Sequence, residues 1–320
     1  MGIPLIVDTD PGVDDAYALT LALSDPAVDV LAVSTVFGNV GVDATTGNAC
    51  RVLSLLDRLD VPVGRGAARP LVHPAPESAA RVHGADGLGG RAADFGEPGP
   101  VVVRRALDVM VTALETASEP VVVAAIGPLT NIALLLATRP DLAQRIRRVV
   151  VMGGAVSDSG NVTPVAEFNL WCDPEAARRV LVEEDVPVTL VPLDLTHRCT
   201  VDEGWLDRLA VTGHVARVLT GSRDTYLHHY RQALGVSAIP LHDAVAVLEA
   251  VAPGTVTTTP LPLEIDTSTG AGRGAVLADR RRLRPDPPEH RPVDVALDAD
   301  VDAVRAALLD RLSRAGATVR

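Results

Sequence analysis

The chain has 320 residues, 47% hydrophobic and 22% charged, so it has room for one large domain or two small ones around a sizeable core. Its formal net charge of −12 argues against electrostatic attraction to nucleic acid or to an anionic membrane. There is no Lys among its basic residues, which excludes Schiff-base chemistry and any nucleotide loop that needs a Lys.

Short Val- and Leu-rich runs alternate with helical segments along the first 250 residues. The pattern predicts strands at residues 4–7, 30–37, 121–126, 148–152 and 187–193. It predicts helices at residues 14–23, 43–58, 128–138, 174–183, 215–233 and 243–251, with Asp43 as an N-cap and Pro128 at a first helical position. Such alternation is typical of a mostly parallel sheet with helices on both faces.

Two regions depart from this alternation. Residues 65–100 are rich in Gly, Pro and Ala and are long for a loop, so we expect a binding loop or lid there. In the tail, strands at 261–265 and 293–297 flank an Arg- and Pro-rich connection, and a helix at 301–312 follows. No repeat or linker is visible, so we expect one α/β domain over residues 1–320.

The chain shows no sign of export or of a membrane span. Cys50, Cys172 and Cys199 are odd in number and widely spaced, which favours a reducing compartment such as the cytoplasm. The N-terminus lacks the basic region of a signal peptide. Residues 120–138 carry no charge, but Gly127 and Pro128 interrupt them, which favours a strand, a turn and a helix.

The densest chemical signal follows the first predicted strand. Four carboxylates, Asp8, Asp10, Asp14 and Asp15, lie within eight residues, between the carboxyl end of a strand and the start of a helix. Ligands bind at that edge of open α/β sheets. The carboxylates repel one another, and no Lys or Arg is near in the sequence, so a divalent cation would supply the missing charge.

The donor set narrows the choice of metal and of motif. Oxygen donors favour Ca²⁺, Mg²⁺ or Mn²⁺ over zinc. An EF-hand counted from Asp8 fails, because Val13 and Leu19 stand where Gly and Glu are needed. A metal-dependent phosphatase with Asp8 as nucleophile stays open as an alternative, although the Lys of such enzymes is absent. A solvated helix N-terminus would be the purely structural interpretation.

Polar groups recur at other predicted strand ends. Residues 126–131 read Ile-Gly-Pro-Leu-Thr-Asn, residues 152–154 read Met-Gly-Gly, and residues 161–169 are dense in amide and carboxylate groups. Such groups recognise sugar hydroxyls through hydrogen bonds. His242 and Asp243 open an apolar helix; in isolation they would be a surface histidine and an N-cap.

Taken together and in order, these motifs resemble the inosine-uridine preferring nucleoside hydrolases. The resemblance spans nearly the whole chain and rests on residues 8–16, 38–39, 83–88, 126–131, 152–154, 167–169, 242–243 and 272–274. It implies a single, Rossmann-like α/β domain with a mixed, mostly parallel sheet, and one bound Ca²⁺. It also implies hydrolysis of ribonucleosides to ribose and free base, in nucleoside salvage or catabolism, by a homodimer or homotetramer.

The resemblance also assigns roles. The carboxylates of Asp10, Asp15 and Asp243 and the carbonyl of Ile126 would hold Ca²⁺, and Asp10 would be the general base for the attacking water. Ribose would be contacted by Asp14, Asn39, Asn161, Glu167 and Asn169, with Met152 nearby. This set suits the chemistry, because anionic groups stabilise the oxocarbenium-like transition state and clamped hydroxyls orient the sugar.

The side of the departing base is less defined. His242 is the first candidate for the general acid, with His83 as a second candidate from the long loop. Tyr226 and Tyr230 are four residues apart, so they share a helix face and could line the base pocket or simply pack. Ala244 stands where the family often has Pro. Purine or pyrimidine preference stays open, as does a non-catalytic ribose- or calcium-binding protein of the same fold.

Overall fold

A computed structural model describes residues 2–74, 76–99, 101, 103–281 and 290–315. Within these residues the strands are β1 Ile3–Thr9, β2 Val28–Thr35, β3 Val63–Arg65, β4 Val103–Arg105, β5 Val121–Ala125, β6 Ile146–Met152, β7 Val188–Val191, β8 Thr200–Asp202, β9 Ala238–Pro240, β10 Thr257–Leu261, β11 Leu263–Ile265, β12 Val276–Ala278 and β13 Val293–Asp298. The α-helices are α1 Val13–Ser24, α2 Val42–Leu55, α3 Ala80–His83, α4 Ala106–Thr116, α5 Thr130–Thr138, α6 Phe168–Cys172, α7 Pro174–Arg178, α8 Leu193–Thr196, α9 Glu203–Ala210, α10 His214–Gly221, α11 Arg223–Leu234, α12 His242–Val251 and α13 Val301–Arg314.

Nine of these strands form one sheet in the order β10-β13-β7-β6-β5-β1-β2-β3-β4. Neighbouring strands pair in parallel, except that β10 runs antiparallel to β13. The short pairs β8-β9 and β11-β12 stand apart from it. The expected mixed, mostly parallel α/β fold is confirmed, and its central strands are buried on both faces, as parallel sheets require.

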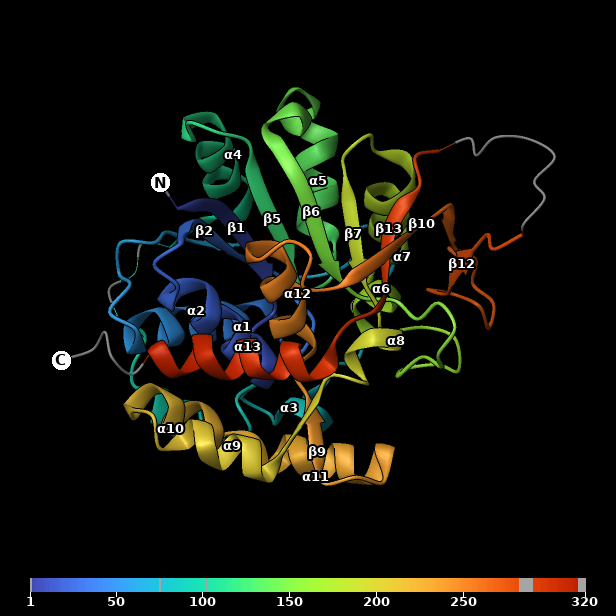
Figure 1. Cartoon of the computed structure of the whole chain (residues 1–320). Coiled ribbons are helices and arrows are strands. Elements are labelled where there is room, and N and C mark those ends of the chain that lie inside the picture. Colours follow the sequence, from blue (N-terminus) through green and yellow to red (C-terminus); the bar gives the residue numbers. More distant parts are fainter. Residues whose placement is uncertain (1, 75, 100, 102, 282–289, 316–320) are drawn as a thin grey trace.

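Successive side chains of the strands point to opposite faces of the sheet and pack into two large apolar cores. On β1, Leu5 and Val7 belong to the core under α1, α2, α12 and α13, whereas Ile6 belongs to the core under α4, α5 and α7. Figure 1 shows these two helical layers on opposite faces of the sheet, with α9, α10 and α11 forming a further layer beyond α1 and α13.

Several predicted boundaries are wrong for local reasons. The N-cap of α2 is Gly41, and Asp43 lies in its first turn, where its Oδ1 is 2.7 Å from Nε of Arg65. α5 begins at Thr130, so Pro128 lies in the preceding turn and not in the helix. The predicted helix at 215–233 is broken between α10 and α11 at Ser222, whose hydroxyl donates to the carbonyl of Leu219 at 2.7 Å.

In other segments the type of secondary structure, or the number of elements, differs from the prediction. The predicted helix at 174–183 is α7 followed by the π-helical turn η3 Arg179–Glu183. The predicted strand at 261–265 divides at Pro262 into the end of β10 and β11. The helices α4 and α9 were not predicted. Residues 282–289 of the Arg- and Pro-rich connection lie outside the described residues, as do 75 and 100 of the long loop.

The long loop contains α3 and the 3₁₀ turn η1 Ala92–Phe95. Its middle is fastened by Asp86, whose carboxylate accepts hydrogen bonds from the amides of Leu88, Gly90 and Ala92. In the part of the chain that the structure describes, no helix combines the length and apolarity needed to cross a bilayer.

Candidate active site

A cavity of about 340 Å³ opens at the carboxyl ends of β1, β5 and β6, where α1, α6 and α12 begin. Its volume lies in the range of small-molecule sites. The predicted site residues that line it are Asp10, Asp14, Asn39, His83, Ile126, Met152, Asn161, Glu167, Asn169, Tyr226, Tyr230, His242 and Asp243. The structure therefore brings together residues from eight separate segments, and Asp15 adjoins Asp14 and Asp243.

Three buried carboxylates meet beside this cavity, two of which, Asp14 and Asp243, line it. Oxygens of Asp14, Asp15 and Asp243 all lie within 4.8 Å of one another. Burial raises the pKa of each carboxyl group, that of Asp14 to about 7, and the charge of Asp15 adds to this effect at Asp14 and Asp243. No Arg belongs to the described lining of the cavity, so the cluster has no cationic side chain to compensate it.

Neighbouring donors orient Asp15 and Asp10. The hydroxyl of Thr9 donates to Oδ1 of Asp15 at 2.5 Å, and the amide of Gly12 donates to its Oδ2 at 2.9 Å. Asn39 joins the two carboxylates, because its backbone amide donates to Oδ2 of Asp10 at 2.8 Å and its Nδ2 donates to Asp15 at 3.0 Å.

The closest trio of carboxylates differs from the expected ligand set in one member. The resemblance implies Asp10 beside Asp15 and Asp243, whereas the trio contains Asp14 in that place. Asp10 lines the same cavity, and the charges of Asp15 and Asp14 contribute to raising its pKa, after burial. The carbonyl of Ile126 also faces this region and accepts a hydrogen bond from Nδ2 of Asn169 at 3.1 Å.

The expected sugar-binding groups form a second wall. Nδ2 of Asn169 also donates to the carbonyl of Met152 at 3.2 Å. Glu167 caps α6, and its carboxylate accepts hydrogen bonds from the amides of Gly154, Asn169 and Leu170. These three amide contacts fix the carboxylate of Glu167 at the cavity wall.

The expected base-side residues form a hydrogen-bonded row. Nε2 of His242 lies 2.8 Å from the hydroxyl of Tyr230, and its Nδ1 lies 2.6 Å from the hydroxyl of Thr196. Burial lowers the pKa of His242 well below its usual value, and His197 and His83 lower it further. His242 is therefore neutral near pH 7. Ala244 leaves the start of α12 intact, since the helix begins at His242.

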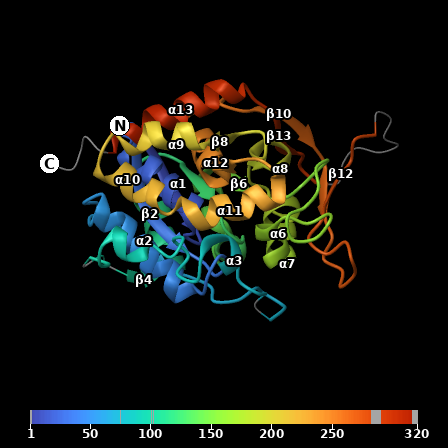
Figure 2. The ribbon, with the colours of Figure 1, turned by 90° about the horizontal axis from the view of Figure 1, so that it is seen from below.

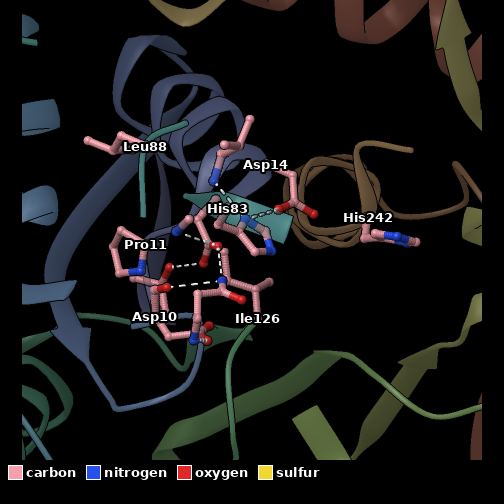
Figure 3. A network of polar contacts seen from close by, with 12 residues as sticks. Asp10, Pro11, Asp14, His83, Leu88, Ile126 and His242 are labelled. Carbon is pink, nitrogen blue, oxygen red and sulfur yellow. Dashed lines mark hydrogen bonds and ion pairs between the residues drawn. The ribbon is translucent and has the colours of Figure 1, made fainter. Parts of the chain in front are cut away.

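His83 has a defined tautomer. Its Nδ1 accepts a hydrogen bond from the amide of Val13 at 3.0 Å, so the proton of the neutral ring is on Nε2. Burial lowers its pKa to about 3. Its ring lies beside Asp14, 3.8 Å from Nδ1 to Oδ1. Figure 3 shows His83 and Asp14 side by side, with His242 farther away at the start of α12.

Close backbone packing makes this arrangement possible. A Cβ on Gly12 would lie 2.4 Å from Nδ1 of His83, and one on Gly127 would lie 2.6 Å from Oδ1 of Asp10. Larger side chains at either position would displace these site residues. The two turns are therefore glycine because site side chains pass directly over their backbone.

Some partners had no signal in the sequence. Thr9 and Thr196 support Asp15 and His242, yet hydroxyl residues of this kind occur throughout the chain. Phe168, His197 and His229 also line the cavity. Asp8, by contrast, is fully buried and accepts hydrogen bonds from Ser34 and Asn131; it does not line this cavity, which argues against a role as a phosphatase nucleophile.

Known proteins are similar to this chain in sequence and in fold. The family model of the inosine-uridine preferring nucleoside hydrolases matches residues 5–306. The pyrimidine-specific ribonucleoside hydrolase RihA of Citrobacter koseri is 35% identical over 315 residues, covering 98% of this chain and 99% of the relative.

Two solved structures of nucleoside hydrolases resemble this chain over almost its whole length. The purine-preferring ribonucleoside hydrolase from Gardnerella vaginalis is similar with a TM-score of 0.89 and 28% identity, and the plant nucleoside hydrolase PpNRh1 with 0.88 and 30%. Each alignment covers 98% of this chain and 99% of the other. The chain thus belongs to the inosine-uridine preferring nucleoside hydrolase family and is an enzyme acting on N-glycosyl bonds.

Proposed function

We propose that this protein is a Ca²⁺-dependent hydrolase that cleaves the N-glycosidic bond of ribonucleosides and releases ribose and free base. The observation that carries the proposal is the buried trio Asp14, Asp15 and Asp243, which lines or adjoins the cavity without a compensating cationic side chain among the described lining residues. Several buried carboxylates in close contact are stable only when a cation or protons neutralise them.

The chemistry of the donors fits Ca²⁺. Asp10, Asp15 and Asp243, with the carbonyl of Ile126, would hold the ion, and all four supply oxygen, which calcium prefers. When bound, the ion supplies positive charge that fixes the vicinal hydroxyls of ribose and makes a water more acidic. Asp14, Asn39 and Asn169 would then contact the same hydroxyls.

The remaining groups supply the chemistry around the sugar. The carboxylate of Asp10 takes the proton of the attacking water, which is consistent with its raised pKa and its orientation by Asn39. Glu167 and Asp14 place negative charge near the ring, where the transition state develops positive charge. The bond from the anomeric carbon to the base breaks as the bond to water forms.

On the opposite side, the departing base takes up a proton. The hydroxyl of Tyr230 and the ring of His242 are 2.8 Å apart and both line the cavity. We assign proton donation to this pair. We rank His83 below this pair, because its Nδ1 is engaged by the amide of Val13 and its ring lies beside Asp14, on the side assigned to the sugar.

The wider assignment follows from the same proposal. We place the enzyme in the cytoplasm, since its three cysteines are free and buried, and we expect residues 1–320 to form one domain in a homodimer or homotetramer. Its partner is a small ribonucleoside and not a nucleic acid or a membrane.

A panel of ribonucleosides tests the proposal. We expect release of free base and reducing sugar from at least one of uridine, cytidine, inosine and guanosine. We expect the matching 2′-deoxyriboside to react at least roughly a hundredfold more slowly, because a buried site built for a hydroxyl discriminates strongly against its absence. Comparable kcat/KM for uridine and deoxyuridine would contradict the proposed recognition of the 2′ and 3′ hydroxyls of ribose.

A further inference from the structure

A groove of about 590 Å³ adjoins the candidate cavity on its outer side. It lies between α3, α11 and residues 161–171, and Figure 2 shows α11 beside α3 at this place. The two spaces share six lining residues, which are Ala79, Val82, Asn161, Val162, Phe168 and His229. The groove is thus continuous with the cavity and larger than it.

Asn161 indicates which part of a nucleoside would face the groove. The carboxylate trio that is proposed to receive the vicinal diol lies on α1 and α12, whereas Asn161 lies on the far wall and lines both spaces. Its Oδ1 accepts the amide of Phe168 at 2.9 Å, and its Nδ2 has no partner among the described residues. The resemblance assigns Asn161 to ribose, and the proposed function assigns the vicinal hydroxyls to the ion, Asp14, Asn39 and Asn169. We therefore assign the Nδ2 donor of Asn161 to the remaining sugar hydroxyl, the one at the 5′ carbon.

The side chains that line the groove determine which kind of substituent on the 5′ oxygen could bind there. Phe168 and Trp171 are three residues apart on α6, so they lie on one face and present aromatic surface together with Val162. Glu77 and Arg81 are the permanently charged side chains of the described lining, which also holds His228 and His229, and the two pair with each other at 3.7 Å. The guanidinium in the described part of the groove is therefore already paired with a carboxylate, which disfavours a phosphate there.

We propose that the enzyme also hydrolyses ribonucleosides whose 5′ oxygen carries an uncharged apolar or aromatic substituent, which occupies this groove. The inference rests on the proposed function and narrows its substrate class. The 5′ oxygen stays in place as an acceptor for Asn161, and the substituent passes between Phe168 and His229 onto Trp171. The reaction at the anomeric carbon is unchanged.

Three substrates with the same base test the proposal: the parent riboside, its 5′-O-benzyl ether and its 5′-monophosphate. We expect the benzyl ether to keep kcat/KM within tenfold of the parent and the monophosphate to lose more than a hundredfold. A benzyl ether slower by more than tenfold, or a monophosphate that reacts as fast as the ether, overturns the assignment. Inactivity toward every parent riboside would instead overturn the proposed function.

A groove-filling variant provides the structural control. Gln232 lines only the outer groove and is exposed on α11, so Gln232→Trp should lower the ratio of benzyl-ether to parent kcat/KM at least tenfold. Asp224→Trp introduces the same side chain at an exposed position of α11 that lines neither space, and should leave the ratio unchanged. An unchanged ratio in Gln232→Trp would contradict occupation of the groove.

Discussion

Asp15 is held by three donors, Thr9, the amide of Gly12 and Asn39, and its carboxylate joins the buried trio. Because it has the most fixed position in the cluster, we expect Asp15→Ala to abolish tight Ca²⁺ binding and activity while the circular dichroism spectrum stays native. Calorimetric titration with Ca²⁺ measures the loss. Stoichiometric calcium in an active Asp15→Ala protein would disprove the metal assignment.

A matched pair of variants resolves the difference between the expected ligands and the closest trio. Asp10→Asn removes one charge from the turn after β1, and Asp14→Asn removes one from the first turn of α1. If Asp10 is the ligand, Ca²⁺ affinity falls at least tenfold in Asp10→Asn and much less in Asp14→Asn. The reverse order would transfer the metal role to Asp14.

His242 is neutral and hydrogen-bonded on both ring nitrogens, so its contribution depends on Tyr230 as well as on its own proton. We expect His242→Ala to slow hydrolysis of natural nucleosides by roughly 10²–10⁴-fold, the usual contribution of a positioned acid. A nitrophenyl riboside, whose leaving group needs no proton, should lose far less.

The same substrate pair discriminates between the candidate acids. His83→Ala should affect both substrates to a similar extent, because its ring orients the pocket and does not supply the proton. Equal losses on both substrates in His242→Ala would instead assign His242 a role in binding, and a selective loss in His83→Ala would make His83 the donor.

At the scale of elements, the sequence predicted the buried strands well because parallel strands are continuous Val-rich runs. β5 and β6 lie within two residues of their expected limits. The strand-end motifs likewise placed the site residues at one edge of the sheet, since that edge follows from parallel topology. The wrongly predicted helix boundaries depend on tertiary contacts. The break between α10 and α11 at Ser222 and the N-cap of α2 at Gly41 have no distinctive local sequence pattern.

Contacts between distant segments could not be predicted either, because they too depend on the tertiary structure. Asn48 on α2 is buried, and its Nδ2 donates to the carbonyls of Pro11 at 3.0 Å and Asp86 at 2.9 Å. Asn48 therefore links the turn at Pro11, beside the acidic cluster, to the long loop at Asp86. No spacing in the sequence connects residues 37 positions apart.

Removing that side chain should loosen the turn. We expect Asn48→Ala to lower the free energy of unfolding by about 1–3 kcal/mol, because the buried carbonyl of Pro11 and the part-buried carbonyl of Asp86 lose their donor. Urea denaturation measures the change. Gln144→Ala is the control, since that exposed amide bonds one carbonyl at 3.2 Å and should change stability by less than about 0.5 kcal/mol. Equal effects in the two variants would show that the contact of Asn48 is not structural.

At the scale of the whole molecule, the acidic cluster couples metal binding to stability. The trio and Asp10 are buried near one another within a chain of net charge −12, so a bound cation relieves repulsion that the folded state alone must bear. At a free Ca²⁺ concentration a hundred times Kd, binding stabilises the folded state by about 2.7 kcal/mol. The Tm should rise with Ca²⁺ in the wild type and stay constant in Asp15→Ala; an equal rise in both would indicate binding elsewhere.

The most direct measurement follows hydrolysis of uridine and inosine by the chelator-treated protein before and after Ca²⁺ is restored, with free base and reducing sugar quantified together. The account predicts negligible activity in the chelator and recovery with calcium, with base and ribose released one to one. Full activity in the presence of the chelator, or release of base without ribose, would contradict it.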